Sequence, residues 1–304
     1  MSEYFDFPIL KTLRMPLYFL LSGLLFKNYG SFFNLIDKKI NKLIVPFLFF
    51  SALALPIIFI NFHQIVYTDL LDPFINPRGG YNGPVWFLLS LFWVNVLFGM
   101  ISLISSNLIV QAVGVVILSC IGSMLGKEQV FLPLHITQAL IALPFFFAGY
   151  LLKKTSLLYN NKFDRYFLVL SLVILIACTW IFDLLDRPHI DFIYLDINGN
   201  IITIYLFSLV VVMSSLLICK GIRWLPVISY IGRFSVVVLG LHWLYIKAFS
   251  LSYTVLISPE LNIPLRFVVV LAACWISIPI IIRYFPGLVA QKDLITLPRF
   301  RKNK

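Results

Sequence analysis

Long apolar stretches follow one another along this chain, and nine of them approach the length of roughly 20 residues that a helix needs to cross a bilayer. Hydrophobic residues make up 61% of the sequence and charged residues only 12%, whereas a soluble domain is about one quarter charged. These values exclude a soluble globular enzyme, a disordered protein and a coiled coil. The stretches do not alternate apolar with polar residues, which argues against a transmembrane β-barrel. The sequence therefore predicts an all-α, polytopic integral membrane bundle.

The nine predicted spans, of which the first is the shortest, lie near residues 13–28, 43–62, 84–104, 108–125, 130–152, 166–182, 201–219, 232–248 and 265–285. The polar segments between them are too short to bury a core of their own. We therefore expect one membrane-embedded domain over residues 1–304, with any chemistry between the helices or at their mouths.

The net charge of +11 is mainly an orientation signal. Lysine and arginine concentrate in short loops on the cytoplasmic side of the membrane. Of the 24 basic residues, 16 lie in four segments that alternate with the other loops along the chain: 27–42, 153–165, 220–223 and 283–304. The C-terminus is therefore predicted to be cytoplasmic, and nine spans place the N-terminus outside. Because the charge maps to membrane loops, we predict no nucleic-acid partner.

Two long segments predicted to lie outside combine aromatic and charged side chains. Residues 63–83 include Arg78 and Tyr81, and residues 183–200 include Asp191 and Tyr194. Aromatic rings pack on the C–H face of a sugar while carboxylates accept its hydroxyls, so these residues are candidates for binding a sugar. An interfacial aromatic belt with solvated acids is the open alternative.

A few polar side chains fall inside the predicted spans. His242 is a candidate general base or donor, and a neutral histidine bonded to a neighbouring helix is its alternative. His135 lies close enough to the outer boundary for interfacial solvation to account for it. Asn95 and Gln138 are interpreted as links between helices.

On the predicted inner side, lysines flank two spans. Lys38, Lys39 and Lys42 precede one span, and Lys153 and Lys154 follow another. They are candidates for holding the phosphates of a cytoplasmic coenzyme. The alternative is that they act as topology anchors, which the positive-inside rule already requires.

Motifs of other enzyme classes are absent from the sequence. It contains no Walker A, GxSxG, HExxH or Cys-x-x-Cys pattern, and its four cysteines lie far apart within spans. We therefore expect no metal site, no ATP-driven pump and no ordinary hydrolase.

Five stretches, in this order and spacing, resemble the membrane acyltransferase-3 family, whose members acylate bacterial surface polysaccharides. They are MPLYFLLSGLLF at 15–26, KKINKLIVPFLFFS at 38–51, GPVWFLLSLFWVNVL at 83–97, LPFFFAGYLL at 143–152 and SYIGRFSVVVLGLHWLY at 229–245. The resemblance covers nearly the whole chain. Each stretch by itself is a low-specificity apolar string, and the ordered set carries the signal.

The resemblance implies a ten-helix fold in the inner or plasma membrane of a bacterium. It also implies transfer of an acyl group, usually acetyl, from a cytoplasmic acyl-CoA to a hydroxyl of a cell-surface or lipid-linked glycan. Lys39 and Lys42 match basic residues of the family and would bind acyl-CoA. Trp86 matches its WFL helix and joins the sugar-binding candidates, and His242 matches a histidine of a late helix and is the candidate catalytic residue. A glycan or solute transporter and a catalytically inactive partner subunit remain the alternatives.

The chain departs from the family pattern at its start. The family opens with a helix that carries a basic residue and, about three turns later, a histidine, and this sequence has no counterpart of either. Arg14 also stands where a histidine is common. We expect a late start, a truncated chain or a relative that has lost catalysis, and the fold to be the ten-helix bundle without its first helix.

Overall fold

The computed structural model describes residues 8–27, 29–62, 67–75, 82–155, 164–222, 225–252 and 259–295. Its helices are α1 (Pro8–Leu24), α2 (Phe32–Lys39), the π-helix η1 (Ile40–Ile44), α3 (Val45–Phe62), α4 (Tyr67–Ile75), the 3₁₀-helix η2 (Gly83–Val85), α5 (Trp86–Ile104), α6 (Leu108–Lys127), the 3₁₀-helix η3 (Pro133–His135), α7 (Ile136–Lys154), α8 (Asp164–Leu184), α9 (Ile201–Gly221), α10 (Pro226–Arg233), α11 (Ser235–Ser252) and α12 (Pro259–Tyr284). A single antiparallel hairpin, β1 (His189–Asp191) with β2 (Asp196–Asn198), is the strand structure of the described part.

The prediction of an all-α, polytopic membrane bundle is confirmed. Seven helices in the described part are long and apolar enough to cross a membrane, and α10 with α11, bent by 90° at their junction, would form an eighth span. The remaining predicted span, near 13–28, coincides with α1, which has 17 residues and contains Pro16. Each predicted apolar range thus falls on a helix, because hydrophobic length and helix length are both set by the bilayer.

The chain divides into two compact units. Unit 1 comprises residues 1–28 and 93–225, and unit 2 comprises residues 29–92 and 226–304. Each unit is assembled from segments far apart in the sequence. The prediction of a single domain over 1–304 stays a prediction.

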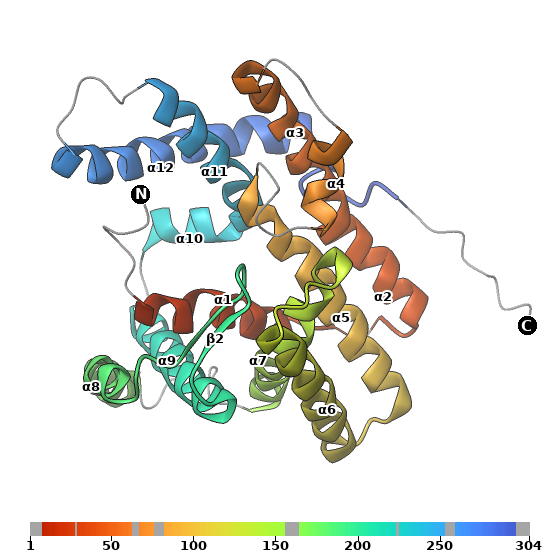
Figure 1. Ribbon diagram of the computed structural model, residues 1–304, viewed down its shortest axis with the longest axis vertical. Coiled ribbons are helices and arrows are strands. Elements are labelled where there is room, and N and C mark those ends of the chain that lie inside the picture. The colour runs from red at the N-terminus through yellow and green to blue at the C-terminus, as the bar shows by residue number, and fades with distance from the viewer. Residues whose placement is uncertain are drawn as a thin grey trace, which may run out of the picture. The chain divides into compact units, whose positions relative to one another are not determined.

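Unit 1 is held together by close helix crossings. The central helix α7 lies beside α6, and α8 lies beside α9 (Figure 1). Helices α1 and α7 cross in backbone contact: a Cβ atom at Gly23 would lie 1.8 Å from the carbonyl oxygen of Phe146, and one at Gly149 would lie 1.9 Å from that of Leu20. Small residues permit such approach, as is typical of helix pairs within membranes.

The β hairpin closes one end of unit 1. Its residues Ile190, Phe192 and Leu195 are buried, and the Phe192 ring lies 5.6 Å from the Phe19 ring of α1. Gln129, at the end of α6, donates to the Leu195 carbonyl at 2.9 Å. The segment 183–200, predicted as an outer segment with sugar-binding candidates, therefore also contains an ordered cap on the helices of unit 1.

Unit 2 combines α2–α4 and the start of α5 with α10–α12. Helices α11 and α12 lie side by side (Figure 1). Helix α11 also meets α3 closely, since a Cβ atom at Gly240 would lie 2.2 Å from the Phe50 ring. Asn82, just before η2, is buried and donates to the carbonyls of Phe50 at 3.2 Å and Gly240 at 2.8 Å. One amide thereby links the entry of α5 to both helices.

Candidate functional site

The two lysines predicted to bind acyl-CoA lie at the π-helix η1 of unit 2. Lys39 is its N-cap and Lys42 is inside it. The Lys42 ammonium donates to the Ala290 carbonyl, whereas Lys39 has no hydrogen bond or ion pair with a described residue. Single π-helical turns occur frequently at functional sites. Of these two lysines, only Lys42 has a hydrogen-bond partner within the described part, so the Lys39 ammonium is the better candidate for binding a phosphate.

A buried asparagine in η1 holds the end of the described chain. The Asn41 side chain is 0% exposed. Its Oδ1 accepts from the backbone N–H groups of Leu294 at 2.6 Å and Ile295 at 2.8 Å, and its Nδ2 donates to the carbonyls of Ile295 at 2.6 Å and Asp37 at 2.9 Å. We call this arrangement the Asn41 clamp. It was not predicted from the sequence, because its partners lie some 250 positions further along the chain.

An ion pair between Lys38 and Asp293 lies beside the Asn41 clamp. The hydrogen bond from the Lys38 ammonium lowers the pKa of the Asp293 carboxyl below its ordinary value. The pair therefore contributes at pH values above the ordinary range of aspartate and is lost as the pH falls through the lowered pKa. The side chains of Lys38 and Asp293 are 42% and 31% exposed, so solvent screening keeps this contribution small.

Replacing Asn41 by leucine should release the segment 290–295 from η1. Four hydrogen bonds of about 1 kcal/mol each are lost, and three of them hold the backbone groups of Leu294 and Ile295. Hydrogen–deuterium exchange should show amides 290–295 exchanging on the order of 100-fold faster. Asn34→Leu is the matched control, because Asn34 is exposed and donates one bond to Tyr29. Equal exchange in the two variants would contradict the clamp.

The candidate base His242 lies in α11 of unit 2 and is half-buried. Its Nδ1 is 2.8 Å from the carbonyl oxygen of Val238, one turn earlier in the same helix. A carbonyl can only accept, so Nδ1 carries the proton and Nε2 is left as the basic nitrogen. The bond of His242 therefore lies within α11, whereas the alternative interpretation expected a bond to a neighbouring helix. The backbone two residues earlier, at Gly240, is fixed by Asn82 and Phe50.

The predicted sugar-binding residues are distributed over both units. Trp86, at the start of α5 in unit 2, is only 2% exposed. Asp191, in the hairpin of unit 1, pairs with Lys11 at 3.3 Å and accepts from the Ile193 N–H at 3.1 Å. Tyr194, at the hairpin tip, is 50% exposed. Arg78 and Tyr81 lie outside the described residues.

Three further polar groups lie in the spans of unit 1. Asn95 donates to Ser22 Oγ at 3.5 Å and links α5 to α1, as expected of a polar contact between helices. His135 is 1% exposed and has a left-handed backbone, with φ of 58°. Gln138 is 0% exposed, and neither its oxygen nor its nitrogen has a partner in the described part. The interpretation of Gln138 as a link between helices is not supported by any such contact.

Residues 2–282 of this sequence match the model of a protein family described as an acyltransferase domain. The chain belongs to this acyltransferase-3 family. Comparisons with curated proteins and with solved structures found no significant match. Together with the spans, the family makes the chain a multi-pass membrane acyltransferase in general terms.

In this acyltransferase the structure brings some predicted residues together and leaves others apart. Lys39 is the N-cap of the π-helix that contains Lys42. Asp191 and Tyr194 lie in one hairpin, where Asp191 pairs with Lys11 of α1. His242 and Trp86 both belong to unit 2, on different helices. Their roles in binding and catalysis stay predictions. The structure adds two buried asparagines that the sequence analysis did not single out, Asn41 and Asn82. The signal for Asn41 is an amide in an otherwise apolar and basic stretch, whereas Asn82 lies in a turn-forming segment.

Proposed function

We propose that this membrane acyltransferase moves an acyl group, acetyl in the simplest case, from acyl-CoA to a sugar hydroxyl of a cell-surface or lipid-linked glycan. The observation that carries the proposal is the orientation of His242, whose Nδ1–H is held by Val238 so that Nε2 can accept a proton. A general base must be within reach of the hydroxyl that it deprotonates and must present a free lone pair.

The proposed reaction needs no group beyond the two substrates. Nε2 of His242 takes the proton of the sugar hydroxyl as the hydroxyl oxygen attacks the thioester carbon. The C–S bond then breaks, the ester forms, and the imidazolium returns its proton to the departing CoA thiolate. A general base of this kind contributes about 10²–10⁴-fold to the rate.

Lys39 supplies the donor end of the proposal. It carries an ammonium group at a π-helical turn, and no described residue neutralises this charge. An ammonium bound to a phosphate oxygen is a strong, charge-assisted contact. Lys42 contributes to the same site if its bond to Ala290 opens when the donor binds.

The acceptor side rests on fewer contacts. Tyr194 is exposed and can pack against a sugar ring, while Asp191 stands beside it with its carboxylate bound to Lys11. Arg78, Tyr81 and Trp86 remain the other candidates for binding the sugar. The proposal places the enzyme in the inner or plasma membrane of a bacterium, with the C-terminus in the cytoplasm and the glycan outside.

A transfer assay in proteoliposomes tests the donor. Radiolabelled acetyl-CoA and cell-envelope glycan should yield labelled glycan, and Lys39→Gln should raise KM for acetyl-CoA about tenfold, because a charge-assisted bond is lost. Lys38→Gln is the matched control, since the Lys38 charge is paired with Asp293. Absence of transfer with every acyl-CoA tried, or substrate counterflow without acyl-CoA, would contradict the proposal.

A further inference from the structure

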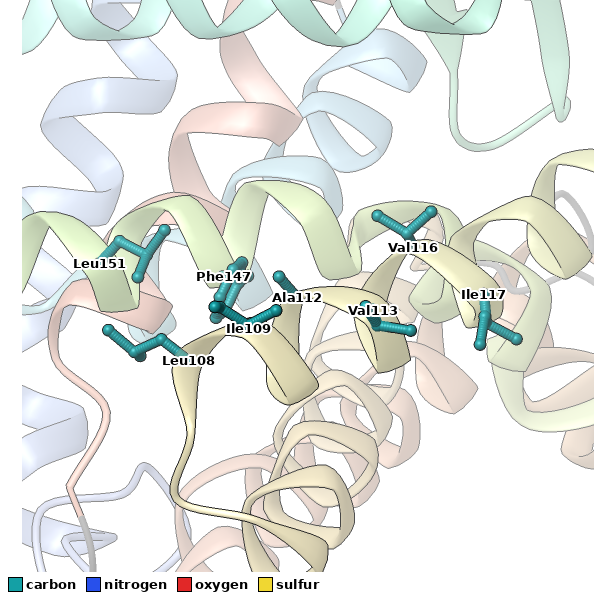
Figure 2. A pocket seen from close by; sticks show the side chains of 8 residues that line it. All are labelled: Leu108, Ile109, Ala112, Val113, Val116, Ile117, Phe147 and Leu151. Carbon is teal, nitrogen blue, oxygen red and sulfur yellow. The ribbon is translucent and has the colours of Figure 1, made fainter.

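An apolar groove runs along the surface of unit 1 between α6 and α7. It has a volume of about 410 Å³ and is lined by Leu108, Ile109, Ala112, Val113, Val116 and Ile117 of α6 with Phe147 and Leu151 of α7. Figure 2 shows the α6 side chains following one another along the helix, with Phe147 and Leu151 facing the Leu108 end. Both helices are long and apolar enough to span the membrane, and the groove is open on the surface of unit 1 at the depth of the hydrocarbon core.

The length of the groove matches one leaflet of a bilayer. The lining residues of α6 run from Leu108 to Ile117, which at 1.5 Å per residue is about 14 Å. Half of a hydrocarbon core of about 30 Å is about 15 Å. The groove also begins at the first residue of α6, so it covers one half of this span and not its whole length. A single extended lipid chain therefore fits it better than a second transmembrane helix, which would contact α6 from end to end.

A lysine stands at the end of the groove where a lipid head group would lie. Phe147, Leu151 and Lys154 follow one another at helical spacing, so Lys154 lies one turn beyond Leu151 on nearly the same face of α7. Lys154 is exposed, and its Nζ lies 4.6 Å from the centre of the Tyr150 ring. A lysine at the end of a span extends its ammonium to the head-group region.

Basic side chains gather at the same end of unit 1, and the opposite end is mixed in charge. The basic end is defined by the contacts of Lys153 with the Phe26 carbonyl and of Gly221 with Leu168. It carries Lys27, Lys153, Lys154, Arg165 and Lys220. The acidic side chains that are described in unit 1 lie at the opposite ends of their helices or in the hairpin: Glu128, Asp183, Asp186, Asp191 and Asp196. There they stand beside Lys11, Lys127 and Arg187, of which Lys11 and Arg187 form ion pairs with Asp191 and Asp183. The local field at the mouth of the groove therefore favours an anion.

We propose that this groove binds an anionic phospholipid, with one acyl chain along α6 and the phosphate at Lys154. The apolar lining selects a hydrocarbon chain, and the lysine at its mouth selects a negative head group. The site lies on α6 and α7 of unit 1 and does not depend on His242 or Lys39.

Native mass spectrometry in mixed micelles tests this site. The protein is equilibrated with equal amounts of phosphatidylglycerol and phosphatidylethanolamine that have identical chains. We expect preferential retention of phosphatidylglycerol. Lys154→Gln should reduce this preference about fivefold, the contribution of one basic side chain near an anionic head group. Arg165→Gln is the matched control, because Arg165 is exposed at the same end of unit 1 but lies in the first turn of α8, which does not line the groove.

A second pair of variants tests the chain-binding part. Ala112→Trp fills the groove and should abolish retention of both lipids, whereas Val173→Trp, at an exposed position on α8, should not. An unchanged preference in Lys154→Gln would overturn the proposal, and this exposed lysine can be replaced without disturbing the core. Equal lipid retention in the two tryptophan variants would also overturn the proposal. So would a wild-type dimer that Ala112→Trp dissociates, because a second copy of the chain would then occupy the groove.

Discussion

His242→Asn is expected to lower acyl transfer by 10²–10⁴-fold, which is the range that a general base contributes. Asparagine can still donate to the Val238 carbonyl, as His242 Nδ1 does at 2.8 Å, but it has no basic nitrogen in place of Nε2. Helix α11 should therefore keep its conformation while proton abstraction is lost. The decrease should appear in kcat, and KM for acetyl-CoA should change by no more than about twofold.

The pH dependence of transfer distinguishes a base from a structural histidine. Only neutral imidazole accepts a proton, so the wild-type rate should rise with pH as His242 loses its proton, and His242→Asn should lack this ascending limb. His189→Asn is the matched control, because His189 Nδ1 also lies 2.8 Å from a backbone carbonyl, that of Arg187 in unit 1. A pH profile shared by wild type and His242→Asn would contradict the role of His242.

Gly149→Ala is expected to prevent α1 and α7 from packing. The new Cβ would lie 1.9 Å from the Leu20 carbonyl oxygen and 2.9 Å from the Leu24 nitrogen. Both are backbone atoms, so no rotamer change can relieve the overlap and the helices must separate. We expect destabilisation by about 3 kcal/mol or more, at the upper end of overpacking. Thermal unfolding in detergent and the yield of monodisperse protein measure it.

The control for this prediction is another glycine within a helix. A Cβ at Gly232, in α10, would have no heavy atom within 4 Å. Gly232→Ala should therefore leave Tm unchanged or raise it slightly, because alanine favours the helix by about 1 kcal/mol. Wild-type stability in Gly149→Ala would show that α1 and α7 do not meet as closely as described.

The sequence predicted the membrane class and the positions of the helices well. Ranges such as 84–104 and 201–219 nearly coincide with α5 and α9. Hydrophobic length is a local property, and the bilayer imposes nearly the same length on every span. The order of motifs also pointed to the family that matches residues 2–282. The bend between α10 and α11 and the hairpin at 189–198 were not predicted, since neither follows from hydropathy.

Side-chain partners could not be read from the sequence in the same way. Lys42 was predicted as a phosphate ligand, and the structure shows its ammonium at Ala290. Asp191 was predicted as a sugar ligand, and it is paired with Lys11, 180 positions earlier in the chain. Gln138 was interpreted as a contact between helices, and its amide has no partner in the described part. Each of these facts depends on which distant segment lies opposite.

The sequence by itself determined that the chain is a helical membrane protein of the acyltransferase-3 family, because span length, composition and motif order are properties of contiguous residues. The tertiary structure alone decided that Asn41 holds residues 294–295, that Gly149 lies against Leu20, and that α6 and α7 form an apolar groove. The physical reason is that hydrogen bonds and packing act over a few ångströms. They are set by which helices meet, and no local pattern of residues encodes that choice.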